Sequence, residues 1–313
     1  MLNVFGHLNP DSDAICSAII AADWLTFTGR PACAWRTGDI NPETRFILES
    51  AGVSAPQLWQ GSVAGKPVWL VDFSELEQGP EGLAEADLQG LFDHHKLGTL
   101  ISQQPLEIWV KPLGCCATVI WQVMRHESPM VISPSQAVLM LGAILSDTVA
   151  LTSSTTTDID RQAVDALFAL TSLEREAFIA SLLAAKTDLS GYSAAGLLTK
   201  DAKPYEINGR AVTVAQIEIA DPRQLAPFMP ELRQALDATP DNSLTVLMVT
   251  NITTRTTELW FSRQPEGIAA PVVLENVMSR KKEVLPWLMR HLPPLPAGAN
   301  HEQLPSYSGA HPR

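Results

Sequence analysis

Residues 5–15 constrain the fold most, because they join an apolar strand to a helix through a polar turn. The Asn-Pro-Asp-Ser segment ends the strand and offers side-chain oxygens to the free N–H groups of the next helix. That helix, predicted at about 14–27, is apolar over most of its surface and is expected to pack against a sheet. His7, Asp11 and Asp13 therefore lie where a strand of an open α/β sheet ends, which is the usual ligand crevice of such folds.

Three later segments also end in side chains that bind cations. The apolar run 67–73 predicts a strand buried on both faces of a parallel sheet, and it contains Asp72 near its end. A shorter strand predicted at 90–95 ends in Asp93, His94 and His95, and a helix predicted from Ser133 carries Asp147 at its end. Because the carboxyl ends of parallel strands lie on one edge of the sheet, these groups are expected to converge.

The remaining pattern predicts two α/β domains. Further strands are expected at 2–5, 31–36 and 108–110, and helices at 41–51, 84–88, 117–124, 158–170 and 173–186. This alternation predicts a doubly wound, mainly parallel sheet in an N-terminal domain at 1–187. A linker or hinge is expected at 188–193, followed by a smaller mixed-sheet α/β domain at 194–313 with a Pro-rich tail at 293–313.

In the second domain the expected elements are fewer. Strands are predicted at 210–219, 244–250 and 257–262, the last two antiparallel to each other. Helices are predicted at 222–238 and again before Ser279.

Composition narrows the functional classes. A formal net charge of -12 and a pI of about 5.0 disfavour an electrostatic nucleic-acid binder. The four cysteines form no C-x-x-C pair, which favours free thiols in a reducing compartment. No basic leader and no long apolar run is seen, so a soluble, cytoplasmic protein with no membrane partner is expected.

The candidate ligands are too many for one tetrahedral zinc ion and suit two adjacent cations. Imidazole and carboxylate without thiolate favour Mn²⁺, Co²⁺ or Mg²⁺. Each residue alone also has an ordinary explanation: Asp72 as a helix cap, Asp147 as a helix end, His94 or His95 as a surface histidine. Their joint placement favours a metal pair, which at a separation of roughly 3.5–4 Å orients a water for in-line attack on phosphorus.

Ser279-Arg280-Lys281-Lys282 is a basic run in an acidic chain, and Lys200 and Lys203 form a smaller one. The commoner meaning of such a run is a solvated basic face. The alternative is an anion clamp that closes across the hinge onto a metal-bound phosphate.

At these residues the sequence resembles the DHH phosphoesterase superfamily and, within it, the family II (manganese-dependent) inorganic pyrophosphatases. Residues 6–15, 71–75, 93–96 and 142–148 stand at the four motifs of the family, and 279–283 resemble the signature of its DHHA2 C-terminal domain. The match spans nearly the whole chain. One departure is Phe73-Ser74, where the family usually has His-Asn after the aspartate, which puts a substrate or ligand-shell hydrogen bond in doubt.

The resemblance implies a metal-dependent hydrolase that converts inorganic pyrophosphate to two phosphates, with two Mn²⁺ (or Co²⁺) and additional Mg²⁺ or Mn²⁺ arriving with the substrate. It implies one metal held by His7, Asp11, Asp72 and Asp147, and a second held by Asp13, Asp72, His94 and Asp147. Asp93 would orient its neighbours, and His95 would lie near the leaving or bridging oxygen, as a phosphate ligand or an acid. Lys203, Arg280 and Lys281 would bind the phosphates, with Lys200 the alternative to Lys203. It also implies a homodimer through the N-terminal domain.

Two other functions stay open from the sequence. One is a related DHH/DHHA2 phosphoesterase acting on polyphosphate or short (cyclic) oligonucleotides. Few aromatic residues lie near the clamp in the sequence to stack on bases, which disfavours the nucleotide substrates. The other is a non-catalytic sensor of metal or phosphate, which the Phe73-Ser74 departure makes conceivable.

Overall fold

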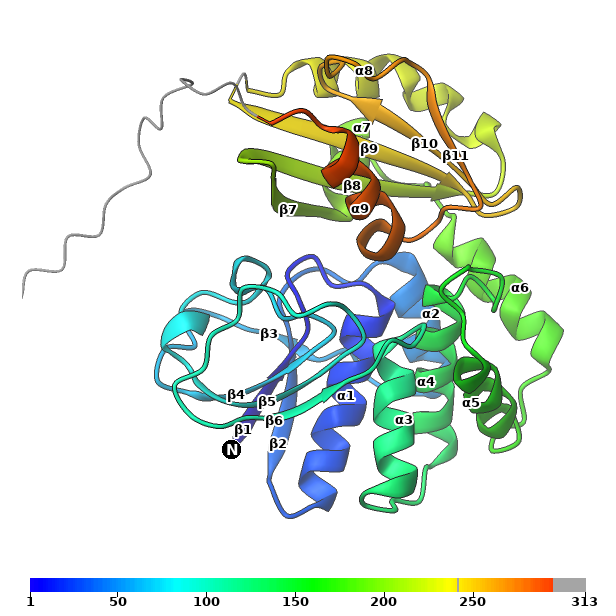
Figure 1. Cartoon of the computed structure of the whole chain (residues 1–313). Coiled ribbons are helices and arrows are strands. Elements are labelled where there is room, and N and C mark those ends of the chain that lie inside the picture. Colours follow the sequence, from blue (N-terminus) through cyan, green and yellow to red (C-terminus); the bar gives the residue numbers. More distant parts are fainter. Residues whose placement is uncertain (241, 295–313) are drawn as a thin grey trace, which may run out of the picture.

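The computed structural model describes residues 1–240 and 242–294, so most of the predicted Pro-rich tail lies outside the described residues. The chain forms two lobes, each built on its own sheet, with one lobe seated over the other (Figure 1). The N-terminal lobe contains the six-stranded sheet and helices α1 to α6, and the C-terminal lobe contains the five-stranded sheet and helices α7 to α9.

The N-terminal sheet is parallel throughout. Its strands are β1 (Leu2–Phe5), β2 (Ala32–Arg36), β3 (Gln57–Leu58), β4 (Pro67–Val71), β5 (Asp87–Asp93) and β6 (Glu107–Val110). They lie in the order β3-β2-β1-β4-β5-β6. The strand order reverses between β1 and β4, which is the switch point at which doubly wound sheets bind ligands. The predicted doubly wound strand order and the mainly parallel sheet are confirmed.

Local signals set where the helices of this lobe begin. The helices are α1 (Ser12–Phe27), α2 (Pro42–Ala51), α3 (Cys116–His126), α4 (Pro134–Asp147), α5 (Asp158–Phe168) and α6 (Arg175–Lys186). Asp11 caps α1, Asn41 caps α2 with a proline at its first position, and Ser133 forms a capping box on α4. Helices α1 and α3 pack on one face of the sheet, α4 packs in turn against α1 and α3, and together they bury the largest apolar cluster (Figure 1).

The opposite face is closed by the connections, not by long helices. Phe5, Leu70 and Leu91 point to this face and pack against Val63 and Leu83 from the loops. The helix predicted at 84–88 is wrong: only the 3-10 turn η2 (Leu83–Glu85) forms, and β5 begins two residues later. Asp87 and Leu88 pair with β4 instead, so strand pairing overrides a weak local helix preference.

The C-terminal sheet is mixed, as predicted. It contains β7 (Ala202–Ile207), β8 (Arg210–Ile219), β9 (Ser243–Asn251), β10 (Thr256–Phe261) and β11 (Val272–Glu275). Only β8 and β9 are parallel; the other neighbours are antiparallel, including the predicted β9–β10 pair. Helices α7 (Ala194–Lys200) and α8 (Met229–Asp237) cover one face, while α9 (Leu285–His291) covers the other (Figure 1).

Two expectations for this lobe are corrected. The helix predicted before Ser279 is the strand β11, and the helical segment follows Ser279 as the π-helical turn η5 (Arg280–Val284) and α9. The helix predicted at 222–238 is helical as α8 only in its second half, after the two 3-10 turns η3 (Pro222–Gln224) and η4 (Ala226–Phe228). Strand β7 was not predicted, because Pro204 interrupts its pattern; as an edge strand, β7 tolerates a proline.

Within 1–240 and 242–294, no helix is both long and apolar enough to cross a bilayer.

Gly6 allows the polar turn to approach α1 closely. A Cβ at this position would lie 2.6 Å from the Ala14 Cβ and 2.8 Å from the Ala14 carbonyl oxygen. We expect Gly6→Ala to lower the free energy of unfolding by about 1–3 kcal/mol through overpacking, measured by urea denaturation. The control is Gly196→Ala in α7, where the nearest side-chain atom is 3.3 Å away; it should be neutral or stabilising by up to about 1 kcal/mol. Equal stabilities for the two variants would contradict this account of the turn.

Candidate metal centre

The predicted ligands meet at the carboxyl edge of the N-terminal sheet, at the β1–β4 switch point. His7 and Asp11 follow β1, Asp72 follows β4, and His94 follows β5. Asp147 is the last residue of α4. Asp11, Asp72, His94 and Asp147 line a cavity of about 140 Å³ between the lobes. His7, and Asp13 from the first turn of α1, each offer a ligand atom within 4.8 Å of an Asp72 oxygen.

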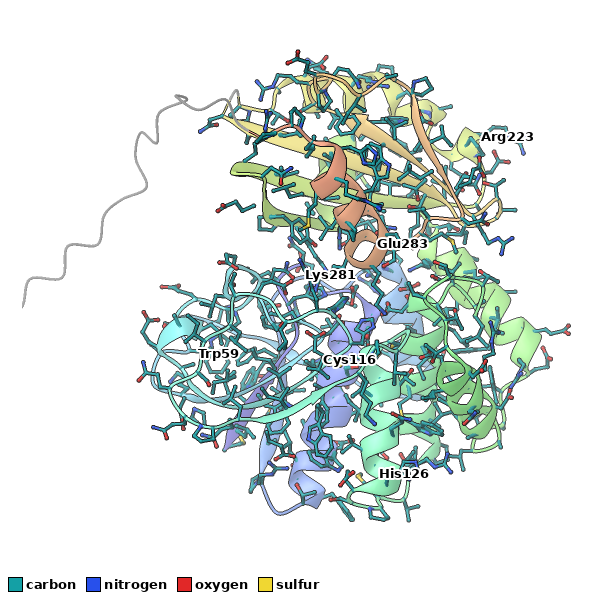
Figure 2. All side chains as sticks on the ribbon, in the orientation of Figure 1. Trp59, Cys116, His126, Arg223, Lys281 and Glu283 are labelled. Atoms are coloured by element: carbon teal, nitrogen blue, oxygen red, sulfur yellow. The ribbon has the colours of Figure 1, made fainter. Side chains whose placement is uncertain are left out.

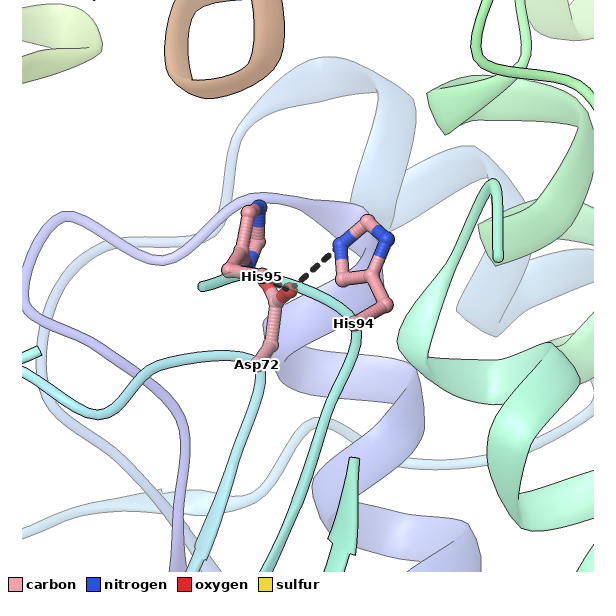
Figure 3. Close-up of side chains that lie close together, drawn as sticks. All are labelled: Asp72, His94 and His95. Atoms are coloured by element: carbon pink, nitrogen blue, oxygen red, sulfur yellow. Dashed lines mark hydrogen bonds and ion pairs between the residues drawn. The ribbon is translucent and has the colours of Figure 1, made fainter. Parts of the chain in front are cut away.

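Asp72 is the centre of this arrangement, because it belongs to every cluster of metal-type ligands within the described residues. Its carboxylate takes part in three clusters, within each of which the ligand atoms lie within 4.8 Å of one another. The other members are His7 and Asp11 in the first cluster, Asp13, His94 and Asp147 in the second, and His94 and His95 in the third. Figure 3 shows the Asp72 carboxylate below the two imidazoles, one on either side. The Asp72 oxygens lie 3.3 Å from His7 Nε2 and 3.1 Å from His94 Nε2.

The two deeper histidines present the same ring nitrogen to the carboxylates. His7 Nδ1 is 2.8 Å from the Leu8 carbonyl oxygen, and His94 Nδ1 is 3.0 Å from the Leu113 carbonyl oxygen. A carbonyl oxygen only accepts hydrogen bonds, so each Nδ1 carries a proton. A metal-ligating imidazole is neutral, so in that state each Nε2 would direct its lone pair at the carboxylates, whereas a protonated Nε2 donates a hydrogen bond to Asp72.

The carboxylates are too close together to be stable as isolated charges. Burial, followed by the Asp72 charge, raises the pKa of Asp13 to about 6. Burial and the charge of Asp13 raise the pKa of Asp147 well above its ordinary value. Burial also opposes ionisation of Asp72, yet hydrogen bonds from His7 and His94 hold its pKa low. Oxygen and imidazole donors with surplus negative charge fit divalent cations such as Mn²⁺ or Mg²⁺.

Asp13 is fixed by a second helix. Its two carboxylate oxygens accept the backbone N–H groups of Cys116 at 2.6 Å and Ala117 at 3.1 Å, at the start of α3, and one of them also accepts the Ser17 hydroxyl. The N-terminus of a helix favours an anion at this place. The Asp13 side chain is therefore held rigidly between α1 and α3.

Asp93 holds the two histidines that follow it. Its Oδ1 accepts the backbone N–H groups of His94 at 2.8 Å and His95 at 3.2 Å, and it lies 2.8 Å from His95 Nδ1. Burial, followed by the charges of His94 and Lys281, lowers the pKa of His95 well below its ordinary value. In this geometry His95 is a neutral imidazole at the cavity wall.

Strained backbone surrounds the site. Asp72 has φ of 68°, in the left-handed region that aspartate tolerates better than most residues. Directly after Asp147 and Thr148, three successive residues, Val149, Ala150 and Leu151, have φ of 46°, 53° and 66°. Such strain persists only where the surrounding structure holds it, and it commonly marks functional sites.

The C-terminal lobe supplies cations to the opposite side of the cavity. Lys203 on β7 is buried, with its Nζ 2.9 Å from His7 Nε2 and 3.7 Å from Asp11 Oδ2. The Nζ of Lys281 is buried, 3.7 Å from a Glu75 oxygen, and makes no hydrogen bond with the part of the chain that the structure describes. Figure 2 places Lys281 at the boundary between the lobes. Lys200 is also near the cavity, but its Nζ lies 5.3 Å from the centroid of the Tyr192 ring.

Arg280 lines the cavity but is already held within its own lobe. Its guanidinium donates to the Asp201 carboxylate at 2.7 Å and to the carbonyl oxygens of Asp201 and Val214. Its Nε is buried without a partner among the described residues.

Lys282, which sequence reasoning gave no role of its own, reaches across to the N-terminal lobe. Its Nζ donates to the Leu113 carbonyl oxygen and lies 3.3 Å from His94 Nδ1. The signal for it was present, because it belongs to the same basic run.

The Phe73-Ser74 departure has a structural account. Phe73 is fully buried on the loop-covered face of the sheet and packs edge-on to His7, with ring centroids 6.5 Å apart. Ser74 Oγ accepts the Gly98 N–H at 2.8 Å. It thereby ties the loop after Asp72 to the segment after His95.

Comparison with known proteins agrees with this geometry. Residues 2–144 match the model of the DHH family N-terminal domain, and residues 180–291 match the DHHA2 domain. A Methanocaldococcus jannaschii protein named "Manganese-dependent inorganic pyrophosphatase" is 35% identical over 312 residues, which cover 93% of this chain and 99% of the relative. The chain belongs to the family II, manganese-dependent inorganic pyrophosphatases.

Other members of the family are similar over the same length. A Deinococcus radiodurans protein named "Probable manganese-dependent inorganic pyrophosphatase" is 36% identical, with 94% of this chain and 99% of the relative covered. A crystal structure from Methanococcus jannaschii assigned to family II superposes with a TM-score of 0.85 at 34% identity, covering 93% of this chain and 99% of that one. An exopolyphosphatase-related protein from Bacteroides fragilis shares only the fold, with a TM-score of 0.50 at 12% identity.

Proposed function

We propose that this chain hydrolyses inorganic pyrophosphate to two phosphates and depends on manganese. The observation that carries the proposal is that seven histidine and aspartate side chains converge at the cavity where the lobes meet. One of them, Asp72, belongs to all three ligand clusters of the described residues. The relatives named as manganese-dependent inorganic pyrophosphatases support it over nearly the full length of the chain.

We assign one cation to His7, Asp11, Asp72 and Asp147, and a second to Asp13, Asp72, His94 and Asp147. The second set is one of the clusters found in the structure, and the first shares His7, Asp11 and Asp72 with another. When bound, a pair of divalent cations lowers the pKa of a water molecule and neutralises phosphate charge. Additional Mg²⁺ or Mn²⁺ is proposed to arrive with the substrate.

The residues of the chain then hold the substrate and exclude water. Lys203 and Lys281 face the cluster from the closed C-terminal lobe and offer positive charge to phosphate oxygens. One edge of the Arg280 guanidinium is hydrogen-bonded to Asp201, and the Nε N–H group has no partner among the described residues. We therefore assign Arg280 to shaping the phosphate pocket with its remaining N–H groups. His95, oriented by Asp93, is assigned to the leaving oxygen.

Further expectations complete the proposal. We propose a division into 1–187, a hinge at 188–193, and 194–313, because the two sheets are separate and non-helical backbone joins α6 to α7. We also propose a homodimer through the N-terminal domain, a cytoplasmic location and no nucleic-acid partner.

The direct test is a substrate panel with the purified, chelator-treated chain. We expect phosphate release from pyrophosphate after addition of Mn²⁺ or Co²⁺ together with Mg²⁺, and much slower release from polyphosphate or a dinucleotide. Faster turnover of either of those substrates than of pyrophosphate would overturn the proposal, as would metal binding without any turnover.

Removing the Asp93 carboxylate should disturb both histidines at once. We expect Asp93→Ala to lower turnover and Mn²⁺ affinity by about 10–100-fold, because the partners that orient ligating histidines typically contribute this much. Asp93→Asn keeps an oxygen that can accept both backbone N–H groups and should lose less. Steady-state rates and calorimetric Mn²⁺ titration measure the two effects; equal losses in both variants would contradict the orienting role.

A further inference from the structure

A second charged cluster borders the same cavity, and nothing in the sequence pattern singled it out. It contains Glu43 on α2, Lys186 at the end of α6 and Glu218 on β8. Lys186 Nζ lies 2.8 Å from Glu218 Oε2 and 3.5 Å from Glu43 Oε2. The side chains of Lys186 and Glu43 are only 11% and 6% exposed.

Glu43 connects the two segments that carry most of the candidate ligands. Its Oε1 accepts the Ser12 hydroxyl at 2.5 Å and the Ser146 hydroxyl at 2.8 Å. Ser12 stands between Asp11 and Asp13, and Ser146 directly precedes Asp147. A single carboxylate oxygen therefore ties the start of α1 to the end of α4.

Lys186 extends this link to the other lobe. Its Nζ donates to Ser146 Oγ at 3.1 Å as well as to Glu218, which belongs to the C-terminal sheet. Lys186 is also the last residue of α6, two residues before the proposed hinge at 188–193. The contact with Glu218 joins the two lobes in the arrangement seen here.

The charges in this cluster are matched to one another. Burial opposes the charge of Lys186, but Glu218 and Glu43 more than offset it and raise its pKa above the ordinary value. An ammonium in this position without its carboxylates would be strongly unfavourable, so the cluster works as a unit. A purely structural ion pair is the simpler explanation, and it makes different predictions.

We propose that Glu43, Lys186 and Glu218 form a positioning cluster that couples closure of the C-terminal lobe to the spacing of the ligand-bearing segments. This inference rests on the proposed function. Glu43 sets the spacing through Ser12 and Ser146, and Lys186 with Glu218 stabilises the closed arrangement in which Lys203 and Lys281 face the site. Within the described residues, no hydrogen bond or ion pair joins Glu43, Lys186 or Glu218 directly to a candidate metal ligand.

Variants of Glu43 and Glu218 test the two roles of the cluster separately. Glu43→Ala should weaken Mn²⁺ binding to the metal-free protein by about 10–100-fold, measured by calorimetric titration, because the ligand segments lose their common anchor. Glu218→Gln should leave that affinity within about twofold and raise KM for pyrophosphate about tenfold, since fewer molecules are closed before substrate binds. Glu206→Gln, an exposed glutamate on β7 of the same lobe, is the control and should change neither quantity.

The outcomes are distinct. If both variants lose only thermal stability, with Mn²⁺ affinity, KM and kcat unchanged, the cluster is a structural ion pair and the inference is overturned. If Glu43→Ala does not fold, Ser12→Ala removes one of the two anchoring hydroxyls with little change in shape. A Mn²⁺ affinity equal to that of the unmodified protein would then overturn the inference. A chain that binds Mn²⁺ with the expected variant pattern but does not hydrolyse pyrophosphate refutes the proposed function and leaves the positioning role of Glu43 standing.

Discussion

Asp72→Asn is expected to lower pyrophosphate turnover by about a thousandfold and to weaken Mn²⁺ binding, while the chain stays folded. Asp72 belongs to every candidate ligand cluster, so its charge would serve both cations. A metal contributes several kcal/mol of charge stabilisation in the transition state, and each 1.36 kcal/mol corresponds to a factor of about ten in rate. Asparagine is the suitable substitute, because it tolerates the left-handed backbone that Asp72 adopts.

The measurements are steady-state phosphate release and calorimetric Mn²⁺ titration, with circular dichroism to follow the fold. Asp87→Asn is the matched control, since Asp87 is exposed at the opposite, amino end of β5 and should change neither quantity appreciably. An Asp72→Asn protein that retains more than about a tenth of the turnover would rule out Asp72 as a shared ligand, given the magnitude above.

The second large effect is expected at Lys203. Its buried Nζ reaches His7 and Asp11 from the C-terminal lobe, so the ammonium is the cation placed closest to the candidate ligands. Lys203→Met keeps the apolar stem and removes the charge. We expect kcat/KM for pyrophosphate to fall by about a hundredfold to a thousandfold, the usual result of removing one preorganised charged donor.

Lys200→Met is the matched control for this variant. Lys200 is close in the chain but lies against the Tyr192 ring, and its removal should cost no more than about threefold, as expected for a partly exposed charge. Steady-state kinetics on both variants measures the difference. The reverse order of effects would assign the substrate contact to Lys200 and contradict the role given to Lys203.

Sequence reasoning located most of the candidate centre because short segments carry it. His7, Asp11 and Asp13 are confined to one strand–helix junction, and Asp93, His94 and His95 are consecutive. The carboxyl ends of parallel strands share one edge, so strand prediction alone brought these segments together with Asp72. The prediction needed no knowledge of side-chain packing, which is why it succeeded over this part of the chain.

Errors arose where the local pattern of a segment is weak. β7 contains Pro204 and pairs with β8 across the turn at Asn208 and Gly209, and β5 begins at Asp87 because β4 lies beside it. Neither segment has a strong pattern of its own. Strand preference depends on what a segment packs against, and that information is absent from a local window.

The sequence by itself thus determined the fold class, the acidic character of the chain and the residue types gathered at the strand ends. Only the tertiary structure decided which lysine reaches His7, that Arg280 is held by Asp201, and that Glu43 joins the segments of Ser12 and Ser146. Strand ends and helix caps are fixed by neighbours a few residues away. The contacts between lobes depend on side chains up to 196 residues apart, whose meeting is set by how two separately folded sheets are seated.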